Sequence, residues 1–230
     1  TEEKSNESTA IPQLLERIDL EDAIVTIDAA GCQKTIAAQI VQGKGDYVLA
    51  LKGNQEKLLH DVKFLMLGPL QDDGSGGPVS RYVEVEQGHG RLESRTYYQM
   101  TAPSYLHGRS EWKGLKTIGA AVRVYEEKGI EKRDVRYYLS SLRRNGRQFA
   151  QVVRRHWGIE NSLHWSLDMT YREDESRVRN RTFAENLSWL RRLTLSLIKQ
   201  HPGKQSNIMK RRMAGWSPDF LMQVLTGKGT

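Results

Sequence analysis

The sequence predicts an α/β protein, and three features of the chain support this fold class. Two apolar runs, AIVTID at residues 23–28 and YVLAL at residues 47–51, are typical of buried strands. The intervening residues 33–42 have a helical period, which is the arrangement of a parallel crossover unit. Residues 80–140 carry β-rich patterns divided by Gly- and Asn-containing turns, which favours an antiparallel segment.

The other elements follow in chain order. Residues 9–18 predict a short helix, because Pro12 falls near the first turn, where a missing N–H costs little. A helical stretch at 55–67 is followed by a loop, GPLQDDGSGGP. Helical patterns return at 148–167 and at 183–200, where Leu187, Leu190, Leu197 and Ile198 share one side. A short helical tail closes the chain.

The charge of the chain is unevenly distributed. Its net charge is +7, but residues 131–230 hold 20 Lys and Arg against 9 Asp and Glu, whereas residues 1–130 hold 15 against 19. A basic half of this size predicts a polyanionic partner, because phosphate contacts release counterions. The alternative is a protein kept soluble by excess charge. Clustering of the basic residues favours nucleic acid. The clusters are Arg143, Arg144 and Arg147; Arg154 and Arg155; Arg177, Arg179 and Arg181; and Lys210, Arg211 and Arg212.

The sequence also limits where the protein works. Cys32 is the single cysteine, which excludes an intrachain disulfide and fits a reducing, cytoplasmic compartment. We expect Cys32 to have only a structural role, as a small residue near the start of a helix. The apolar runs are too short to span a bilayer, and the polar N-terminal segment TEEKSNESTA is not a secretory signal. We therefore expect no membrane partner.

Residues 154–177 concentrate acids, bases and two tryptophans. On a helix, His156, Glu160, His164 and Asp168 advance by 40° each and share one flank, beside a stripe of Ile159, Leu163 and Leu167 that would be buried. An acid beside a buried stripe, surrounded by bases and aromatic rings, suits a site that handles a metal and a polyanion together.

Four segments resemble a known family. TIDAAGCQ, YVLALKGNQ, HWGIENSLHWSLDMTYREDESR and AENLSWLRRL are similar to insertion-sequence transposases related to the H-repeat-associated proteins of Rhs elements. The resemblance extends from about residue 5 to residue 225. It implies a bacterial DDE transposase with a ribonuclease-H-like catalytic core.

The resemblance implies roles for particular residues. Asp28 matches the second catalytic aspartate, and Glu160 matches the third acidic residue; both would be metal ligands. The alternatives are a strand-end acid that caps the next helix for Asp28 and a helix-surface acid paired with a histidine for Glu160. Contacts to double-stranded DNA are expected from Lys52, Asn54, Arg154, Arg155, His156, Trp157, Asn161, His164, Trp165 and Arg177. For the two tryptophans, the alternative is core packing.

The resemblance also predicts the organisation of the chain. Residues 1–54 would form the N-terminal part of the ribonuclease-H-like core, residues 55–140 a β-rich insertion subdomain, and residues 141–230 the C-terminal helical part that carries the catalytic glutamate. The first catalytic aspartate has no match, since Asp19 and Asp22 fall in a helix and its turn. We therefore expect an incomplete core that lacks its early strands and binds Mg²⁺ weakly without cutting DNA. Its exposed sheet edge would favour self-association.

The chemistry that the resemblance implies is phosphoryl transfer on DNA. Two Mg²⁺ ions, for which Mn²⁺ can substitute, would activate the nucleophile and stabilise the leaving oxygen at insertion-element ends. Such hard ions prefer carboxylate ligands. The broader insertion-sequence signature places Tyr, Arg and Lys around the glutamate, but these positions here are Val153, His156 and Leu167. His156 is the one polar substitute.

Two alternatives stay open. His156, Glu160 and His164 at i, i+4 and i+8 could instead face one zinc ion, although the spacing is not HExxH. The chain could also be a non-catalytic DNA-binding or dimerising remnant of a transposase, with its arginines on phosphates and its tryptophans on bases. Metal analysis and DNA cleavage assays separate these readings.

Overall fold

The computed structural model describes residues 7–72, 78–88, 91–127, 129–159, 163 and 165–227. The chain divides into two compact units, Thr1–His156 and Trp157–Thr230.

The first unit begins with the parallel crossover that the sequence predicts. Helix α1 (Glu7–Leu15) precedes strand β1 (Ile24–Ile27), helix α2 (Lys34–Gln42) and strand β2 (Asp46–Leu51). Strands β1 and β2 are parallel and pair from Ile24 with Asp46 to Ile27 with Leu49. The crossover is confirmed, and it leaves the carboxyl ends of both strands at the same edge of the sheet.

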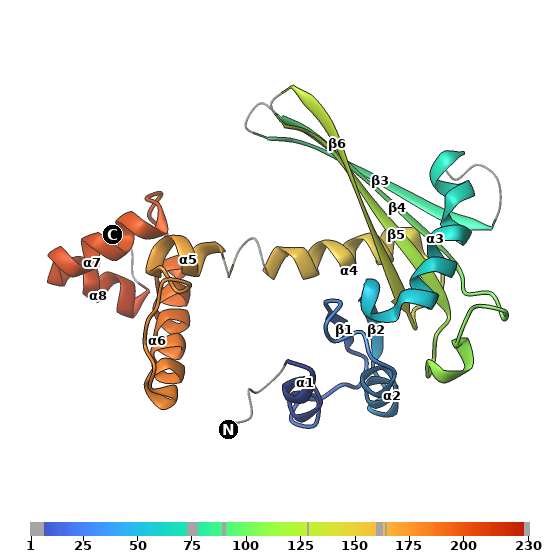
Figure 1. The fold of residues 1–230 in the computed structure, drawn as a ribbon. Coiled ribbons are helices and arrows are strands. Elements are labelled where there is room, and N and C mark those ends of the chain that lie inside the picture. The colour runs from blue at the N-terminus through green and yellow to red at the C-terminus, as the bar shows by residue number, and fades with distance from the viewer. Residues whose placement is uncertain are drawn as a thin grey trace. The chain divides into compact units, whose positions relative to one another are not determined.

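The β-rich segment continues this same sheet. A 3-10 turn, η1 (Gly53–Gln55), and helix α3 (Glu56–Gln71) precede strands β3 (Val79–Gly88), β4 (Arg91–Thr101), β5 (Thr117–Glu127) and β6 (Ile130–Ser140). A second 3-10 turn, η2 (Arg109–Glu111), separates β4 from β5. The strand order is β1-β2-β6-β5-β4-β3, and β6 pairs antiparallel with β2. The α/β class is therefore confirmed as one six-stranded mixed sheet (Figure 1).

This topology differs from the expected layout in one respect. Residues 55–140 do not form a separate sheet, because β6 joins β3–β5 directly to the parallel pair. The division at 156 and 157 also falls inside helix α4 (Gly146–Ile159), which the sequence assigns wholly to the C-terminal part. The boundaries at 54 and 140, and the resemblance to a ribonuclease-H-like core, remain predictions.

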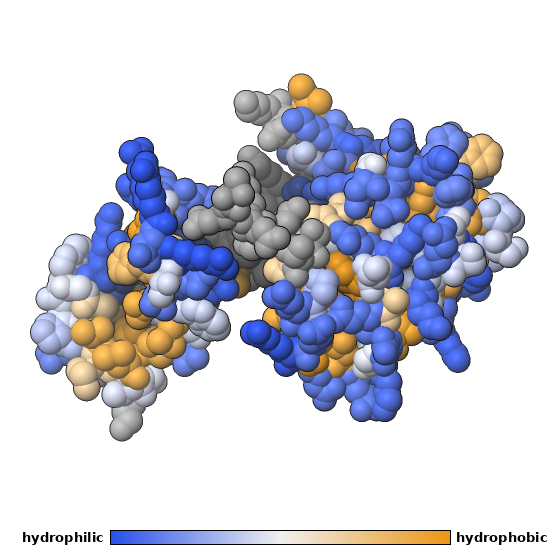
Figure 2. All heavy atoms as spheres, turned by 60° about the horizontal axis from the view of Figure 1, so that its bottom comes forward, coloured by the Kyte–Doolittle hydropathy of each residue, from blue (hydrophilic) through white to orange (hydrophobic). Residues whose placement is uncertain are grey.

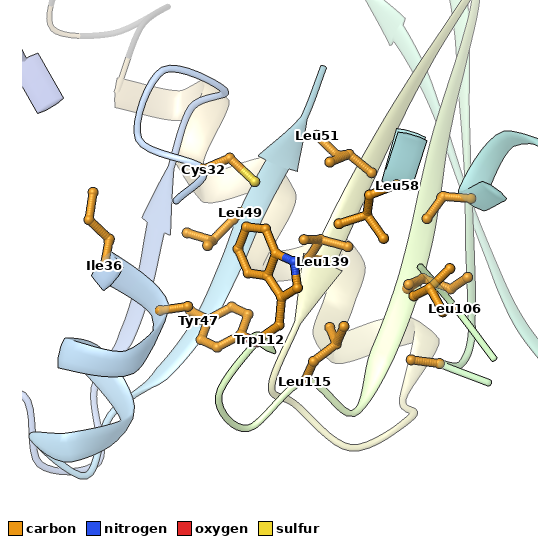
Figure 3. Close-up of a cluster of buried hydrophobic side chains, with 14 of the residues drawn as sticks. Cys32, Ile36, Tyr47, Leu49, Leu51, Leu58, Leu106, Trp112, Leu115 and Leu139 are labelled. Carbon is orange, nitrogen blue, oxygen red and sulfur yellow. The ribbon is translucent and has the colours of Figure 1, made fainter. Parts of the chain in front are cut away.

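One face of the sheet, here called the core face, holds the main hydrophobic core. Helices α2 and α3 contribute Ile36, Ile40, Leu58, Val62 and Met66, and the sheet contributes Leu49, Leu51, Tyr98, Ile118 and Leu139. Trp112, from the loop between β4 and β5, lies between Tyr47 and Leu139 (Figure 3). The apolar runs in AIVTID and YVLAL are strands because alternate side chains enter this core.

Helix α4 packs on the opposite face, here called the α4 face. Phe149 is fully buried and makes edge-on contacts with Tyr97 at 6.4 Å and Tyr138 at 5.6 Å between ring centroids. The absence of a side chain at Gly119 makes room for this ring, since a Cβ there would lie 2.5 Å from Phe149 Cζ. The N-terminal half of α4 is therefore fixed by a tight aromatic contact.

Charged residues cover the rest of the α4 face. Glu86 on β3 pairs with Arg95 on β4 at 2.8 Å and with Arg154 on α4. Glu93 on β4 pairs with Arg95 and accepts two hydrogen bonds from Arg123 at 2.8 and 2.7 Å. The network connects three strands to the C-terminal half of α4.

We expect Glu86→Gln to lower the free energy of unfolding by less than about 1 kcal/mol at pH 7, because the Glu86 side chain is half-exposed. The hydrogen bond from Arg95, aided by Arg154 and opposed by desolvation, holds the pKa of Glu86 below its ordinary value of 4.5. A lowered pKa means that this stability is present above 4.5 and is lost as the pH falls further. Urea unfolding of both proteins from pH 7 to about pH 3 checks this. A difference that widened in acid would contradict it.

Strand β1 forms one edge of the sheet and has four residues. In the described part of the chain, β1 pairs with β2 alone. An exposed strand edge offers unpaired backbone groups to another chain. The self-association expected from the sequence remains a prediction.

The second unit contains helices α5 (Trp165–Tyr171), α6 (Arg181–Gln200), α7 (Asn207–Trp216) and α8 (Pro218–Thr226). Side chains of Asn180, Ser206 and Ser217 cap the last three helices. Ile198, Phe220 and Val224 form its small core. Leu190, which the sequence predicts on the same side of α6 as Ile198, is 56% exposed, whereas Ile198 is buried. Figure 2 shows hydrophobic residues gathered on part of this unit's surface.

One basic residue does not have the role that clustering indicated. Lys210 is buried, and its ammonium donates hydrogen bonds to the carbonyls of His201 at 2.7 Å and Ile198 at 3.4 Å. It therefore satisfies the last carbonyl groups of α6, where a cation is favourable. The expectation of a phosphate contact at Lys210 is wrong.

None of the helices among the described residues combines the length and the apolar character needed to cross a membrane.

Candidate active site

Asp28 directly follows β1, and its carboxylate is held by the loop that it begins. The Oδ1 atom accepts hydrogen bonds from the backbone N–H groups of Ala30 at 3.1 Å and Gly31 at 3.4 Å. These bonds close a local turn of the kind that Asp favours. The alternative, that Asp28 caps the next helix, is only partly met. Asp28 stabilises the turn before α2, but the N-cap residue of α2 is Gln33. Asp28 remains exposed, so its carboxylate is accessible to a ligand.

The loop after β2 supports the Asp28 turn from the neighbouring strand end. The amide of Asn54 donates to the Ala29 carbonyl at 2.7 Å, and the amide of Gln55 donates to the Cys32 carbonyl at 3.1 Å. Lys52 is exposed beside them. Asn54, expected to hold DNA, therefore contacts the Asp28 loop. The LKGNQ motif fixes the backbone around Asp28 through side-chain amides.

Helix α4 reaches the same strand from the α4 face. His156 Nδ1 lies 3.1 Å from Thr26 Oγ1, and the histidine tautomer decides which atom donates. Thr26 lies on β1, two residues before Asp28. Arg154 pairs with Glu86, while Arg155 is exposed. Glu160 follows the last residue of α4 in the sequence and lies outside the described residues.

The other predicted site residues are distributed as follows. Asn161 and His164 lie outside the described residues, so the shared flank of His156, Glu160, His164 and Asp168 remains a prediction. Trp157 is half-buried at the end of α4. Trp165 is 61% exposed at the start of α5, which excludes a core-packing role within its own unit. Arg177 is exposed before α6.

Asp28 fits a hard divalent cation as a single ligand. Its exposed carboxylate offers oxygen, the donor that Mg²⁺ prefers, and two N–H groups hold its orientation. Within the described ranges, no three His, Cys, Asp or Glu side chains come together as a metal site. The zinc alternative is untested, because two of its three residues lie outside those ranges.

Cys32 has the structural role expected from the sequence. It is fully buried beside the start of α2, and burial raises the pKa of its thiol to about 12. The thiolate, which is the reactive form, is therefore scarce at neutral pH.

Three residues that make contacts in this region were not predicted from the sequence. Thr26 is a hydroxyl residue within the apolar run AIVTI, and this break in the pattern was a usable signal. Gln55 adjoins the motif that was noted. Glu86 gave no signal, because its partner Arg154 is 68 positions away in the chain.

Comparisons with known proteins show the family of this chain. A family model described as "Transposase DDE domain" matches residues 1–197. The chain is 39% identical over 92% of its length to "Putative transposase YncI" of Escherichia coli O157:H7, covering 55% of that protein. It is 37% identical over its whole length to "H repeat-associated putative transposase YhhI" of Escherichia coli strain K12, covering 61% of it.

The chain thus spans little more than half the length of these curated relatives. The family match covers β1 with Asp28, the whole mixed sheet and α4. The resemblance noted in TIDAAGCQ and the segment after His156 is therefore confirmed. This chain belongs to the DDE transposase family and is related to the H-repeat-associated transposases.

Proposed function

We propose that this chain forms part of the catalytic domain of a DNA transposase that cleaves and transfers strands at insertion-element ends. The observation that carries the proposal is the meeting of two elements at β1. Asp28 is held at the carboxyl end of this strand, and α4, which leads to Glu160, contacts the same strand through His156 and Thr26. Family membership supplies the reaction class.

The chemistry requires carboxylates that converge on the scissile phosphate. A pair of divalent cations supplies nucleophile activation and leaving-group stabilisation when bound. Asp28 would contribute one carboxylate, with its orientation set by the N–H groups of Ala30 and Gly31. Glu160, the next residue in the sequence after α4, would contribute the other. Asn54 and Gln55 keep the Asp28 loop against the end of β2, so that little reorganisation is needed on binding.

Exposed basic and aromatic residues support a DNA substrate. Lys52 directly follows β2, the strand that pairs with β1, and Arg155 lies on α4 one residue before His156; both are exposed. In the second unit, Arg177 and Trp165 are exposed. Arginine and lysine pair with phosphates, and an exposed indole can stack on an unpaired base. The net charge of +7 favours association with DNA.

The proposed metal site can be tested by iron-mediated cleavage of the protein backbone. Fe²⁺ occupying an Mg²⁺ site generates hydroxyl radicals with ascorbate and peroxide, which cut the chain near the ion. We expect two cuts, one near residue 28 and one near residue 160, and both should be suppressed by excess Mg²⁺. Glu160→Gln should weaken both. Cuts at unrelated positions, or stoichiometric zinc in the purified protein, would contradict the proposal.

The substrate is tested by fluorescence anisotropy with duplexes from the DNA that flanks the reading frame. We expect affinity to fall steeply with salt, because binding releases counterions. Tighter binding to the flanking ends than to a scrambled duplex of the same length would support a transposase. Equal affinity for both would count against end recognition by this chain.

Among the described residues, Asp28 does not belong to any group of three His, Cys, Asp or Glu side chains that could hold a metal ion. We therefore expect the 230-residue chain by itself to nick supercoiled DNA poorly with Mn²⁺. Strong nicking that depends on Asp28 would overturn this expectation while leaving the metal site intact. The iron cuts and the nicking assay thus answer separate questions.

A further inference from the structure

A short connection after β6 borders one end of the sheet in the first unit. Residues 141–146 leave β6 and enter α4, and hydrogen bonds tie them to one strand after another. The bonded pairs are Ser141 with Tyr47 on β2, Leu142 with Thr117 on β5, Asn145 with Gln99 on β4, and Gly146 with Ser80 on β3. From β2 to β3 the connection crosses four strand intervals of about 4.8 Å each, or about 19 Å in all.

Basic side chains from two segments distant in sequence gather along this border. All are exposed: Lys113 and Lys116 from the turn before β5, and Arg143, Arg144 and Arg147 from the connection and the first turn of α4. The two segments adjoin, because the Lys116 N–H donates to the Ser140 carbonyl at 3.0 Å. We call these five residues the basic rim. The arginines already form a cluster in the sequence, whereas the fold adds the lysines.

The charge of the basic rim is not balanced by acids of its own. The sequences WKGLKT at 112–117 and SLRRNGRQF at 141–149 contain no Asp or Glu. None of the five side chains forms an ion pair with a residue that the structure describes. Arg144 donates to the carbonyl of Pro78, which is a neutral group, so its charge is also uncompensated.

Two acids adjoin these segments without removing the excess charge. Glu111 pairs with Lys34 at 2.6 Å, and together they are neutral. Asp46 is half-buried and accepts a hydrogen bond from the Ser141 hydroxyl at 2.6 Å. Because Asp46 can offset only one charge, the basic rim stays strongly positive.

The basic rim lies at the other end of the strands from Asp28. Strand β6 runs antiparallel to β2, so its last residues lie beside the amino end of β2, with Ser140 opposite Val48. Asp28 and Lys52 instead follow the carboxyl ends of β1 and β2. The six residues of β2 separate the two edges by about 17 Å, at about 3.3 Å per residue. A phosphate held at the basic rim is therefore out of reach of a metal ion bound at Asp28.

We propose that the basic rim binds the phosphate backbone of duplex DNA, independently of base sequence and separately from the Asp28 edge. Phosphates follow one another along a DNA strand at about 3.4 Å of helix axis, so a border of about 19 Å faces about five of them. Lysine and arginine contacts to phosphates hold a duplex in place without reading its bases. The identity of the polyanion as DNA rests on the proposed function, whereas the binding of a polyanion rests on the charge and length of the rim.

The first test leaves the protein unaltered. Lysines of the full chain are acetylated with and without a short duplex of scrambled sequence, and the modified positions are read by mass spectrometry. We expect the duplex to slow the modification of Lys113 and Lys116 severalfold at low salt. Lys63 on α3 is also exposed and has no ion pair with a described residue, so its rate should not change.

The second test removes two charges from the basic rim. Lys116→Gln with Arg143→Gln should lower the slope of log affinity against log salt concentration by about two units on the scrambled duplex, because each lost phosphate contact removes about one. Lys63→Gln with Arg133→Gln is the matched control, since it removes one exposed lysine and one exposed arginine elsewhere in the same unit. The control should keep the wild-type slope.

A third variant separates charge from packing. Lys116→Arg with Arg143→Lys exchanges the two side chains but keeps both charges, and it should bind the scrambled duplex with the wild-type slope. Circular dichroism of all variants should be the same, because the replaced side chains are exposed.

The outcomes separate this inference from the proposed function. Unprotected lysines, or equal slopes for the rim variant and its matched control, would overturn the role of the rim even if the chain prefers insertion-element ends. Loss of that preference, with protected lysines and a lower slope in the rim variant, would count against the proposed function and leave the rim standing. Tighter binding to single-stranded RNA, with the variant's effect confined to RNA, would also overturn the assignment to DNA.

Discussion

Phe149→Ala is expected to lower the free energy of unfolding of the first unit by about 3–5 kcal/mol, the usual cost of removing a fully buried phenyl ring. The ring fills the space above Gly119 and contacts Tyr97 and Tyr138 edge-on. Its loss would leave a cavity between α4 and the sheet, because these tyrosines belong to strands and cannot close it. Denaturant unfolding followed by circular dichroism measures the change.

The control for this variant is Phe64→Ala on α3. Phe64 is 69% exposed, so its removal should cost less than about 0.5 kcal/mol. Equal costs for the two variants would show that Phe149 does not anchor α4.

Asp28→Asn is expected to lower Mn²⁺ affinity by roughly 100-fold or more, since it replaces a charged ligand and losses of 10–100-fold already follow removal of outer-shell partners. The amide keeps the shape of the side chain and can still accept hydrogen bonds from Ala30 and Gly31 through its oxygen. The turn should therefore persist while the negative charge is lost. Titration of Mn²⁺ monitored by electron paramagnetic resonance gives the affinity directly.

Asp19→Asn is a matched control for this second variant. Asp19 is also exposed, and its Oδ1 accepts a backbone hydrogen bond two residues ahead, from Glu21 at 3.0 Å. It precedes β1, however, and lies away from the carboxyl end of that strand. Its replacement should leave Mn²⁺ affinity unchanged. Comparable losses in the two variants would indicate nonspecific binding to acidic residues.

Local patterns were enough to predict much of the fold. The runs AIVTID and YVLAL predicted β1 and β2, because short, mainly apolar runs of this length are typical of strands that pack against a core. The helices α2, α3 and α6 followed from their periodicity. The pairing of β6 with β2 could not be predicted, since Leu139 and Leu49 become neighbours only through tertiary contacts that no local pattern encodes. The four later strands were therefore assigned to a subdomain of their own.

The candidate site was predictable to a similar extent. Asp28 was noticed because an acid ends an apolar strand, and the structure places it directly after β1. The amide contacts of Asn54 and Gln55 and the ion pair of Arg154 were not predictable, because charge and amide patterns do not reveal partners distant in sequence. The prediction that Lys210 contacts phosphate ignored the possibility that a cation is used inside the protein, as Lys210 is at the end of α6.

The pairing of β2 with β6 affects the order in which the chain folds. The backbone of Tyr47 donates a hydrogen bond to the Ser141 hydroxyl, across 94 positions of sequence. Contacts of such long range slow folding, because the loop between them must be ordered before the contact compensates for the lost entropy. The antiparallel pairs among β3 to β6 can form early. Strand β2, which carries Tyr47, can pair with β6 only after Ser141 has been synthesised. Until then, the apolar surface of β2 stays available to chaperones or to neighbouring nascent chains.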